Sequence, residues 1–219
     1  MNFKRITIIS GHYGSGKTNI AVSLALDLKK QHENTAIADI DIVNPYFRTK
    51  DSEEILNGNG IRLICSEYAN SNVDIPALPQ EMYAVTDDKT LYSILDVGGD
   101  ERGALALGRI APKIREENNF EMIYVVNKYR PLTSDADSAI EVMREIEAAC
   151  KLKFTCIINN SNLGAETDEE TVLSSLDYAK EISEKTGLPI LFTTVSENLY
   201  LGLKDRIENL YHINLQKRM

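Results

Sequence analysis

The sequence predicts an α/β fold, a three-layer, doubly wound and mostly parallel sheet with helices on both faces. Short apolar runs rich in β-branched residues alternate with longer segments of helical periodicity, which is typical of consecutive βαβ units. In two runs, 123–126 and 156–158, apolar residues follow one another without alternation. Strands of that kind are covered on both faces, as in a parallel sheet. No repeat, low-complexity tract or linker is visible, so residues 1–219 are interpreted as one domain.

Seven strands are expected from the apolar runs. Each run is short, rich in valine, isoleucine, threonine or aromatic residues, and separated from the next by a helical or turn-forming segment. The expected strands are Arg5–Ser10, Thr35–Asp41, Arg62–Cys65, Leu91–Val97, Met122–Asn127, Phe154–Asn159 and Ile190–Thr194.

Helices are expected between these strands. The segment 19–29 carries apolar residues at helical spacing directly after the first strand. Two later helices have start signals, Ser134 with Asp137 and Thr167 with Glu170, of which the second has the form of a capping box.

The segment 66–89 does not fit the alternation. It contains Pro76 and Pro79, several asparagines and only a short helical pattern at 80–85. A connection of this length is uncommon in a compact domain and is often functional. A purely structural excursion is equally consistent with the sequence.

The composition predicts a cytoplasmic protein without a membrane or general nucleic-acid partner. No apolar run approaches the roughly 20 residues of a membrane helix, and 6–9 is too short for a signal-peptide core. A net charge of −9 argues against binding to nucleic acid or anionic lipid, since both need clustered basic residues. The amphipathic stretch 201–215 lacks a basic face and is expected to pack on the domain. Cys65, Cys150 and Cys156 form no CxxC pair and are expected to be reduced core thiols.

The strongest functional signal is GxxxxGKT at residues 11–18. It follows the first strand and opens the first helix, which is the context this motif requires. The glycines let successive backbone amides point at phosphate oxygens, and the helix N-terminus adds partial positive charge. Lys17 is expected to reach the β- and γ-phosphates, and Thr18 to place its hydroxyl on magnesium. The predicted nucleoside triphosphate site comprises Gly11, His12, Tyr13, Gly14, Ser15, Gly16, Lys17 and Thr18.

Two carboxylates end the second expected strand. The strand period of two puts Asp39 and Asp41 on one face at the carboxyl end, where α/β sheets bind ligands. We interpret one of them as part of a magnesium shell and the other as the group that orients an attacking water. A pair of solvated loop acids is the alternative.

A DxxG motif follows the fourth expected strand. Asp96 fits an acid that binds magnesium through water, and Gly99 offers an amide that can approach a γ-phosphate and move when it leaves. Alone, the motif is equally consistent with a simple turn, but the P-loop and the paired acids favour a nucleotide-dependent switch.

Together these motifs resemble the SIMIBI class of P-loop ATPases, specifically its MinD, ParA and CobQ/CobB-like group. The resemblance covers most of the chain and includes 39–48 as a first switch and 96–99 as a second. It implies that Asp41, with the P-loop lysine, is catalytic, and that Asp39 and Asp96 lie in the magnesium shell. The implied ligands are ATP, its product ADP, and Mg²⁺.

The resemblance also places base recognition at an asparagine after a late strand, here Asn159. Thr194 and Val195, at the end of the following strand, would close the adenine pocket. A guanine-specific site would carry NKxD, whereas 127–130 reads NKYR, with Arg130 in place of the acid. ATP is therefore favoured over GTP, although Asn159 is also consistent with a turn residue at a strand end.

His12 stands where many members of this group carry a lysine that reaches the partner's phosphates in an ATP-bound dimer. The resemblance implies an ATP-dependent homodimer, but the histidine puts activation by that lysine in doubt. An imidazolium could supply charge, since adjacent anions raise the pKa of a histidine. A neutral loop histidine is equally consistent.

Three functions are consistent with these motifs. The first is an Mg²⁺-dependent ATPase that acts as a nucleotide switch on a protein client. The second is a small-molecule kinase or ATP-dependent ligase of the CobQ/CobB type, for which Arg102, Arg109 and Arg115 offer either a phosphate clamp or a solvated helix face. The third is a nucleotide-dependent binding module with little hydrolysis. Dependence of ATP turnover on a metabolite or on a protein discriminates the first two.

Overall fold

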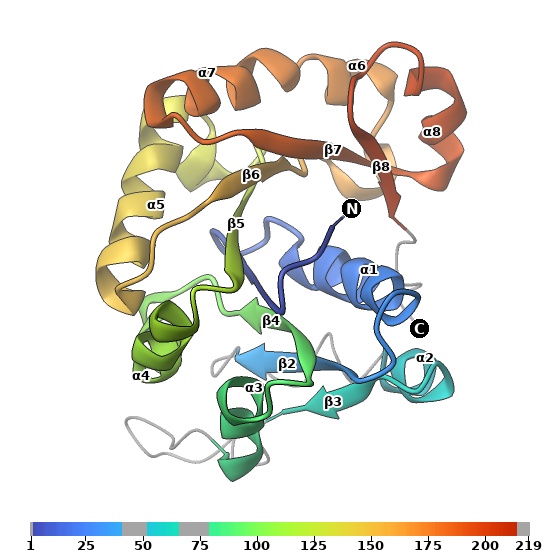
Figure 1. Ribbon diagram of the computed structural model, residues 1–219. Coiled ribbons are helices and arrows are strands. Elements are labelled where there is room, and N and C mark those ends of the chain that lie inside the picture. The colour runs from blue at the N-terminus through green and yellow to red at the C-terminus, as the bar shows by residue number, and fades with distance from the viewer. Residues whose placement is uncertain (1, 41–51, 66–78, 214–219) are drawn as a thin grey trace.

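The computed structural model describes residues 2–40, 52–65 and 79–213. An eight-stranded sheet runs through it in the order β3-β2-β4-β1-β5-β6-β7-β8, and every pairing among the described residues is parallel (Figure 1). The predicted fold class is confirmed. The strands are β1 (Ile6–Ser10), β2 (Thr35–Ile40), β3 (Arg62–Ile64), β4 (Tyr92–Val97), β5 (Phe120–Val126), β6 (Cys156–Asn159), β7 (Ile190–Ser196) and β8 (Leu210–Ile213).

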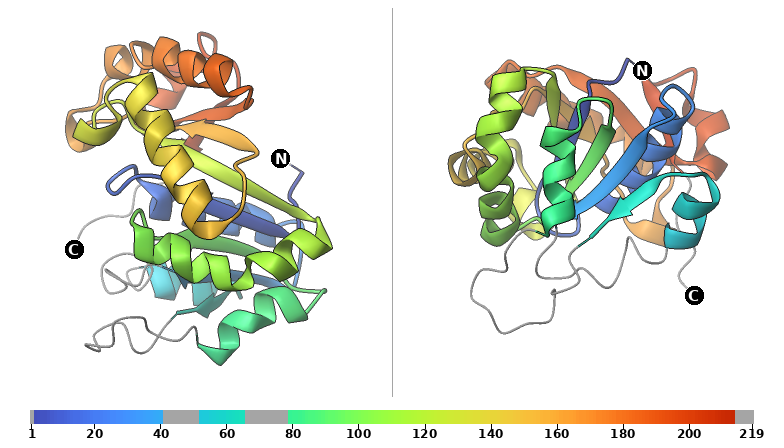
Figure 2. Two further views of the ribbon diagram at one scale, coloured as in Figure 1. Left: turned by 90° about the vertical axis from the view of Figure 1, so that its left-hand side faces the viewer. Right: turned by 60° about the horizontal axis from the view of Figure 1, so that its bottom comes forward.

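Helices cover both faces of the sheet. Figures 1 and 2 show α1 and α2 on one side, and α4 and α5 on the other together with α3. The α-helices are α1 (Lys17–Lys29), α2 (Glu53–Gly58), α3 (Ala84–Asp87), α4 (Glu101–Glu117), α5 (Ala136–Cys150), α6 (Glu169–Leu173), α7 (Leu176–Thr186) and α8 (Glu197–Leu203). Short 3-10 helices lie at Gln80–Tyr83, Pro131–Thr133 and Gly164–Glu166.

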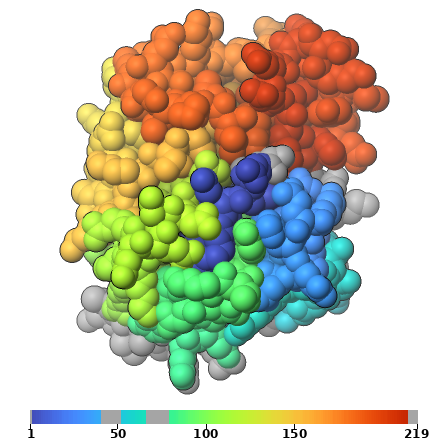
Figure 3. Space-filling model, viewed as in Figure 1, coloured from blue at the N-terminus to red at the C-terminus, as the bar shows by residue number. Residues whose placement is uncertain are grey.

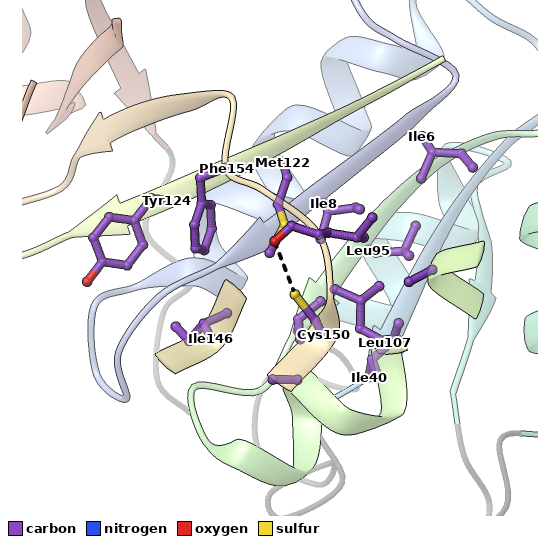
Figure 4. Close-up of a cluster of buried hydrophobic side chains, with 14 of the residues drawn as sticks. Ile6, Ile8, Ile40, Leu95, Leu107, Met122, Tyr124, Ile146, Cys150 and Phe154 are labelled. Carbon is purple, nitrogen blue, oxygen red and sulfur yellow. Dashed lines mark hydrogen bonds between the residues drawn. The ribbon is translucent and has the colours of Figure 1, made fainter. Parts of the chain in front are cut away.

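Each strand supplies both hydrophobic layers because successive side chains point to opposite faces. Ile8 packs into the layer under α4 and α5, while Ile9 packs under α1. In the first layer, the Tyr124 and Phe154 rings lie 4.9 Å apart (Figure 4). The hydroxyl of Tyr124 donates to the carbonyl of Ala139 at 2.7 Å, so this buried phenol has its polar partner.

A buried arginine anchors the start of β1 far from the predicted phosphate loop. Arg5 pairs with Glu117 at the end of α4, and its Nη1 donates to the carbonyls of Val85 at 2.9 Å and Leu91 at 2.8 Å. Figure 3 shows the N-terminal segment, in dark blue, between α1 and the end of α4. The hydrogen bond from Arg5 lowers the pKa of the Glu117 carboxyl. This contact joins β1, β4 and α4 into one unit.

The seven expected strands are all present, each within two residues of its expected bounds. The two expected helix starts were each placed one residue too early. Asp135 caps α5 and Asp168 caps α6, accepting from the backbone N–H of Ser138 at 2.9 Å and Thr171 at 2.8 Å. Thr167 cannot serve as the cap, because its hydroxyl closes the preceding turn on the carbonyl of Gly164.

An eighth strand, β8, was not expected from the sequence. The stretch predicted to pack on the domain does so, with Leu203 and Ile207 buried against Val195, but it divides between α8 and β8. Asn209 has a left-handed backbone (φ 56°), and the strand begins at the next residue. β8 is short and half-exposed, so its pattern resembles the end of an amphipathic helix.

The cysteine expectation holds for two of three residues. Cys150 and Cys156 are buried, and burial raises the pKa of both thiols, that of Cys156 to about 12. Cys65 is exposed instead, because it follows the last residue of β3, a strand at the border of the sheet. Of the excursion 66–89, the described part 79–89 contains a short helical segment as expected. No helix in the described ranges combines the length and apolar character needed to cross a bilayer.

Candidate nucleotide site

The loop between β1 and α1 has the backbone that phosphate binding requires. Gly11 has φ 152° and Gly16 has φ 90°, both in the range that favours glycine. A Cβ on Gly11 would meet the carbonyl of Val125 in β5, and a Cβ on Gly16 would meet the side-chain nitrogen of Asn160. The loop is therefore pressed closely against the carboxyl ends of β5 and β6, and larger residues do not fit at these two positions.

Lys17 and Thr18 begin α1 at the loop's closing end. Both are buried, and the ammonium of Lys17 donates to the carbonyl of His12 at 3.2 Å, across the loop opening. The hydroxyl of Ser15 is buried and has no hydrogen-bond partner among the described residues. A buried hydroxyl without a partner costs free energy, which a phosphate oxygen in the loop would recover. These donors fit a bound polyphosphate.

Asp39 and Asp96 lie side by side on neighbouring strands. The two residues are register partners in the β2–β4 pairing, so their side chains leave the same face of the sheet about 5 Å apart. Both are buried, with 7% and 3% of their surfaces exposed. Adjacent buried carboxylates repel unless a cation lies nearby, and their oxygens, like the Thr18 hydroxyl, are hard ligands of the kind that Mg²⁺ prefers. Asp41 lies outside the described residues.

The DxxG glycine contacts the phosphate loop directly. A Cβ on Gly99 would lie 2.5 Å from the backbone nitrogen of Tyr13 and 2.8 Å from the carbonyl oxygen of Gly11. At the next residue, Asp100 caps α4 by accepting from the backbone N–H of Gly103 at 2.9 Å. The second predicted switch therefore joins the loop to the start of α4.

Asn159, predicted to take part in base recognition, has its side chain engaged inside the fold. The residue is fully buried. Its amide nitrogen donates to the hydroxyl of Ser175 at 2.9 Å, and its amide oxygen accepts from the hydroxyl of Ser161 at 2.7 Å. With both ends of the amide engaged inside the fold, Asn159 fixes the turn after β6.

The neighbouring Asn160 contacts the phosphate loop, and sequence reasoning missed it. Its amide nitrogen donates to the carbonyl of Ser15 at 2.6 Å, and its amide oxygen accepts from the hydroxyl of Thr194 in β7. Thr194 is thus placed beside the site through Asn160. Val195, predicted to close the adenine pocket, packs with Val172 on the α6–α8 side. Strand alternation was the available signal, since it turns 159 and 160 in opposite directions.

Arg130 also contacts the phosphate loop. Its Nε donates to the carbonyl of Gly14 at 2.8 Å. His12 lies half-buried nearby, and its pKa is lowered by burial and by the positive charges of Lys17 and Arg130. A protein of net charge −9 thus gathers basic groups at this loop, which favours an anionic ligand.

A known protein family matches most of this chain. Residues 6–174 match the model of the CobQ/CobB/MinD/ParA nucleotide binding domain. The chain belongs to this family. The resemblance predicted from its motifs, to the MinD, ParA and CobQ/CobB-like group of SIMIBI P-loop proteins, is confirmed, and the site is a nucleotide-binding site. A comparison with curated proteins finds no match.

Solved structures share the fold of this chain at low identity. FtsY from Mycoplasma mycoides has 18% identity and a TM-score of 0.57, with 90% of this chain and 63% of that chain covered. Chloroplast FtsY from Physcomitrella patens has 17% identity and a TM-score of 0.57, with 90% and 60% covered. The signal recognition particle receptor FtsY from Elizabethkingia anophelis, solved in complex with GDP, has 17% identity and a TM-score of 0.52, with 90% and 59% covered. The chain spans about three fifths of these proteins.

Proposed function

We propose that this protein is a cytoplasmic, Mg²⁺-dependent ATPase that acts as a nucleotide switch on a protein client. The observation that carries the proposal is the register of Asp39 with Asp96, two buried carboxylates close to a phosphate loop. Such a pair supplies oxygen ligands, directly or through water, to a magnesium ion bound by a triphosphate and Thr18. The contact of Gly99 with the loop supports the switch, because loss of a γ-phosphate there would act on α4.

ATP is proposed over GTP on the basis of the loop after β5. A carboxylate accepts from the two neighbouring N–H donors of guanine, and NKxD motifs supply one at their last position. Here that position is Arg130, whose side chain contacts Gly14 instead. The half-buried Asn162 after β6 carries an amide, which can both donate to and accept from adenine. Since FtsY from Elizabethkingia anophelis is solved with GDP, both nucleotides belong in the test.

Calorimetric titration of the wild type and Lys17→Ala with ATP and with GTP, each with Mg²⁺ and with EDTA, tests ligand and metal. We expect Mg²⁺-dependent ATP binding by the wild type, and no ATP binding by Lys17→Ala. The wild type should bind GTP at least about tenfold more weakly than ATP, a difference of about 1.4 kcal/mol in binding free energy. Equal or tighter GTP binding would overturn the choice of base. Binding that survives Lys17→Ala would overturn the assignment of the loop.

Turnover tests the catalytic part of the proposal. Asp41→Ala is expected to bind ATP but not to hydrolyse it, and hydrolysis at the parental rate would contradict the assignment of Asp41. The same variant, held in the ATP state, is the bait for a protein client. Stimulation of ATP turnover by a metabolite rather than by a protein would favour the kinase or ligase alternative. ATP binding without turnover would favour the nucleotide-dependent binding module. Light scattering with and without ATP tests an ATP-dependent homodimer.

A further inference from the structure

The phosphate loop has a metal side and an opposite side. β4 and β2, which carry Asp96 and Asp39, lie on one side of β1, and β5, β6 and β7 lie on the other. Magnesium is shared between the terminal phosphates and the metal-side carboxylates, so these phosphates point toward β4. The nucleoside then leaves the loop on the opposite side, over the ends of β5 and β6.

Arg130 lies on this opposite side with most of its guanidinium unused. Nε, Cδ and Cζ pass within 3.4–3.7 Å of the position that a Cβ on Gly14 would occupy, so the side chain runs along the flank of the loop. Its Nε already donates a hydrogen bond to the carbonyl of Gly14. Within residues 2–40, 52–65 and 79–213, the remaining N–H groups of this guanidinium have no hydrogen-bond acceptor.

The other side chains of the same turn point elsewhere. Lys128 donates to the carbonyl of Ser174 at 2.8 Å, and the hydroxyl of Tyr129 donates to the carbonyl of Thr171 at 2.7 Å. Both therefore contact the α6–α7 region. Arg130 alone among the three contacts the phosphate loop.

The backbone around Arg130 is fixed before any ligand arrives. Its own N–H donates to the carbonyl of Asn127 at 3.2 Å, and its carbonyl accepts from the N–H of Thr133 at 3.0 Å. The hydroxyl of Thr133 donates to the carbonyl of Asn127 at 2.9 Å, and Asn127 is fully buried. A guanidinium held in this way loses little conformational entropy when a ligand binds.

We propose that the planar guanidinium of Arg130 stacks on the purine base of the bound nucleotide. This inference rests on the proposed function, which requires a nucleotide in the loop. The cation attracts the π-face of a base, and every purine offers such a face, so Arg130 contributes affinity without choosing between adenine and guanine. Its bond to Gly14 couples the base to the loop that holds the phosphates.

Tripolyphosphate separates base stacking from phosphate binding, because it fills the loop and has no base. The dissociation constants of MgATP and Mg-tripolyphosphate are measured for the wild type, Arg130→Ala and the control Arg62→Ala, an exposed arginine at the amino end of β3. Arg130→Ala is expected to weaken MgATP about tenfold and to leave tripolyphosphate within about twofold. Retained tripolyphosphate binding also shows that the loop is intact. Arg62→Ala should bind both ligands like the wild type.

The other outcomes each overturn something specific. Equal losses for MgATP and tripolyphosphate would assign Arg130 to the phosphates or to the loop itself and would overturn stacking. Unchanged MgATP binding in Arg130→Ala, with normal wild-type affinity, would overturn the role of Arg130 and leave the proposed function standing. Absence of nucleotide binding by the wild type would overturn the proposed function and stacking together.

Discussion

The two sides of the phosphate loop are built from different chemistry. On the metal side, Asp39 and Asp96 place two buried carboxyl groups in register. On the opposite side, the side-chain amides of Asn159 and Asn160 are hydrogen-bonded to hydroxyls and a backbone carbonyl within the fold. The first arrangement offers oxygen ligands of the kind a metal ion prefers, whereas the amides of the second are already hydrogen-bonded within the fold. The difference predicts that variants on the metal side change chemistry, and that variants on the opposite side change stability as well.

The largest effect is expected from Asp96→Asn on the metal side. Removal of one carboxylate weakens the magnesium shell, so MgATP turnover should fall by a factor of at least about 100. The unfolding midpoint without nucleotide should not fall, because the amide has nearly the same volume and relieves repulsion from Asp39. Steady-state phosphate release and thermal unfolding, measured on one preparation, check both parts. A large loss of stability at an unchanged rate would reverse the comparison.

Asn160→Ala should show the opposite balance. It leaves the carbonyl of Ser15 and the hydroxyl of Thr194 without their amide partner, at a cost of about 1–3 kcal/mol in the free energy of unfolding. MgATP affinity should fall too, since the loop loses its tie to β7. Urea unfolding gives the first quantity and calorimetry the second. Asn59→Ala is the matched control, because this exposed amide donates to the backbone carbonyl of Ile55 in α2 at 2.8 Å and takes no part in the proposed site.

Asn159→Ala tests whether Asn159, unlike the neighbouring Asn160, affects stability alone. The variant should cost about 2 kcal/mol in the free energy of unfolding, since it removes a fully buried amide that holds Ser161 and Ser175. The ratio of ATP to GTP affinities should stay at its wild-type value. A shift of that ratio toward GTP would return Asn159 to the base-reading role that its sequence position suggested.

The smallest effect concerns His12 and pH. Burial and two nearby cations lower its pKa in the folded protein, so the unfolded chain binds the proton more tightly. The free energy of unfolding therefore falls as the pH drops through the pKa of His12 in the unfolded chain, about 6.5. His12→Gln lacks this pH-dependent contribution. The difference in urea midpoint between the two proteins, followed from about pH 8 to about pH 5.5, is the measurement. A difference that does not vary with pH would show that His12 titrates normally.

Sequence reasoning predicted the metal side better than the opposite side. The motif spacing and the strand period place Gly11, Lys17, Asp39 and Asp96 from local information alone. The contacts of Asn160 and Arg130 with the loop join segments more than a hundred residues apart. Strand alternation shows that the two adjacent asparagines point in opposite directions, but which of them meets the loop depends on contacts with segments distant in the sequence. β8 was missed for a related reason, since four residues, of which Ile213 alone is buried, gain their strand geometry from β7.

Gly99 couples movement of the phosphate loop to movement of α4. No side chain separates it from the backbone of Tyr13, and Gly103 in α4 is similarly pressed on Gly98. The loop and α4 are thus joined through the backbone of residues 98–99, with no side chain between them. α4 has 17 residues, with Pro112 in its second half, and is about 25 Å long. A tilt of about 5° at its start moves its far end by about 2 Å, so a small displacement at the phosphates is magnified at a distant surface.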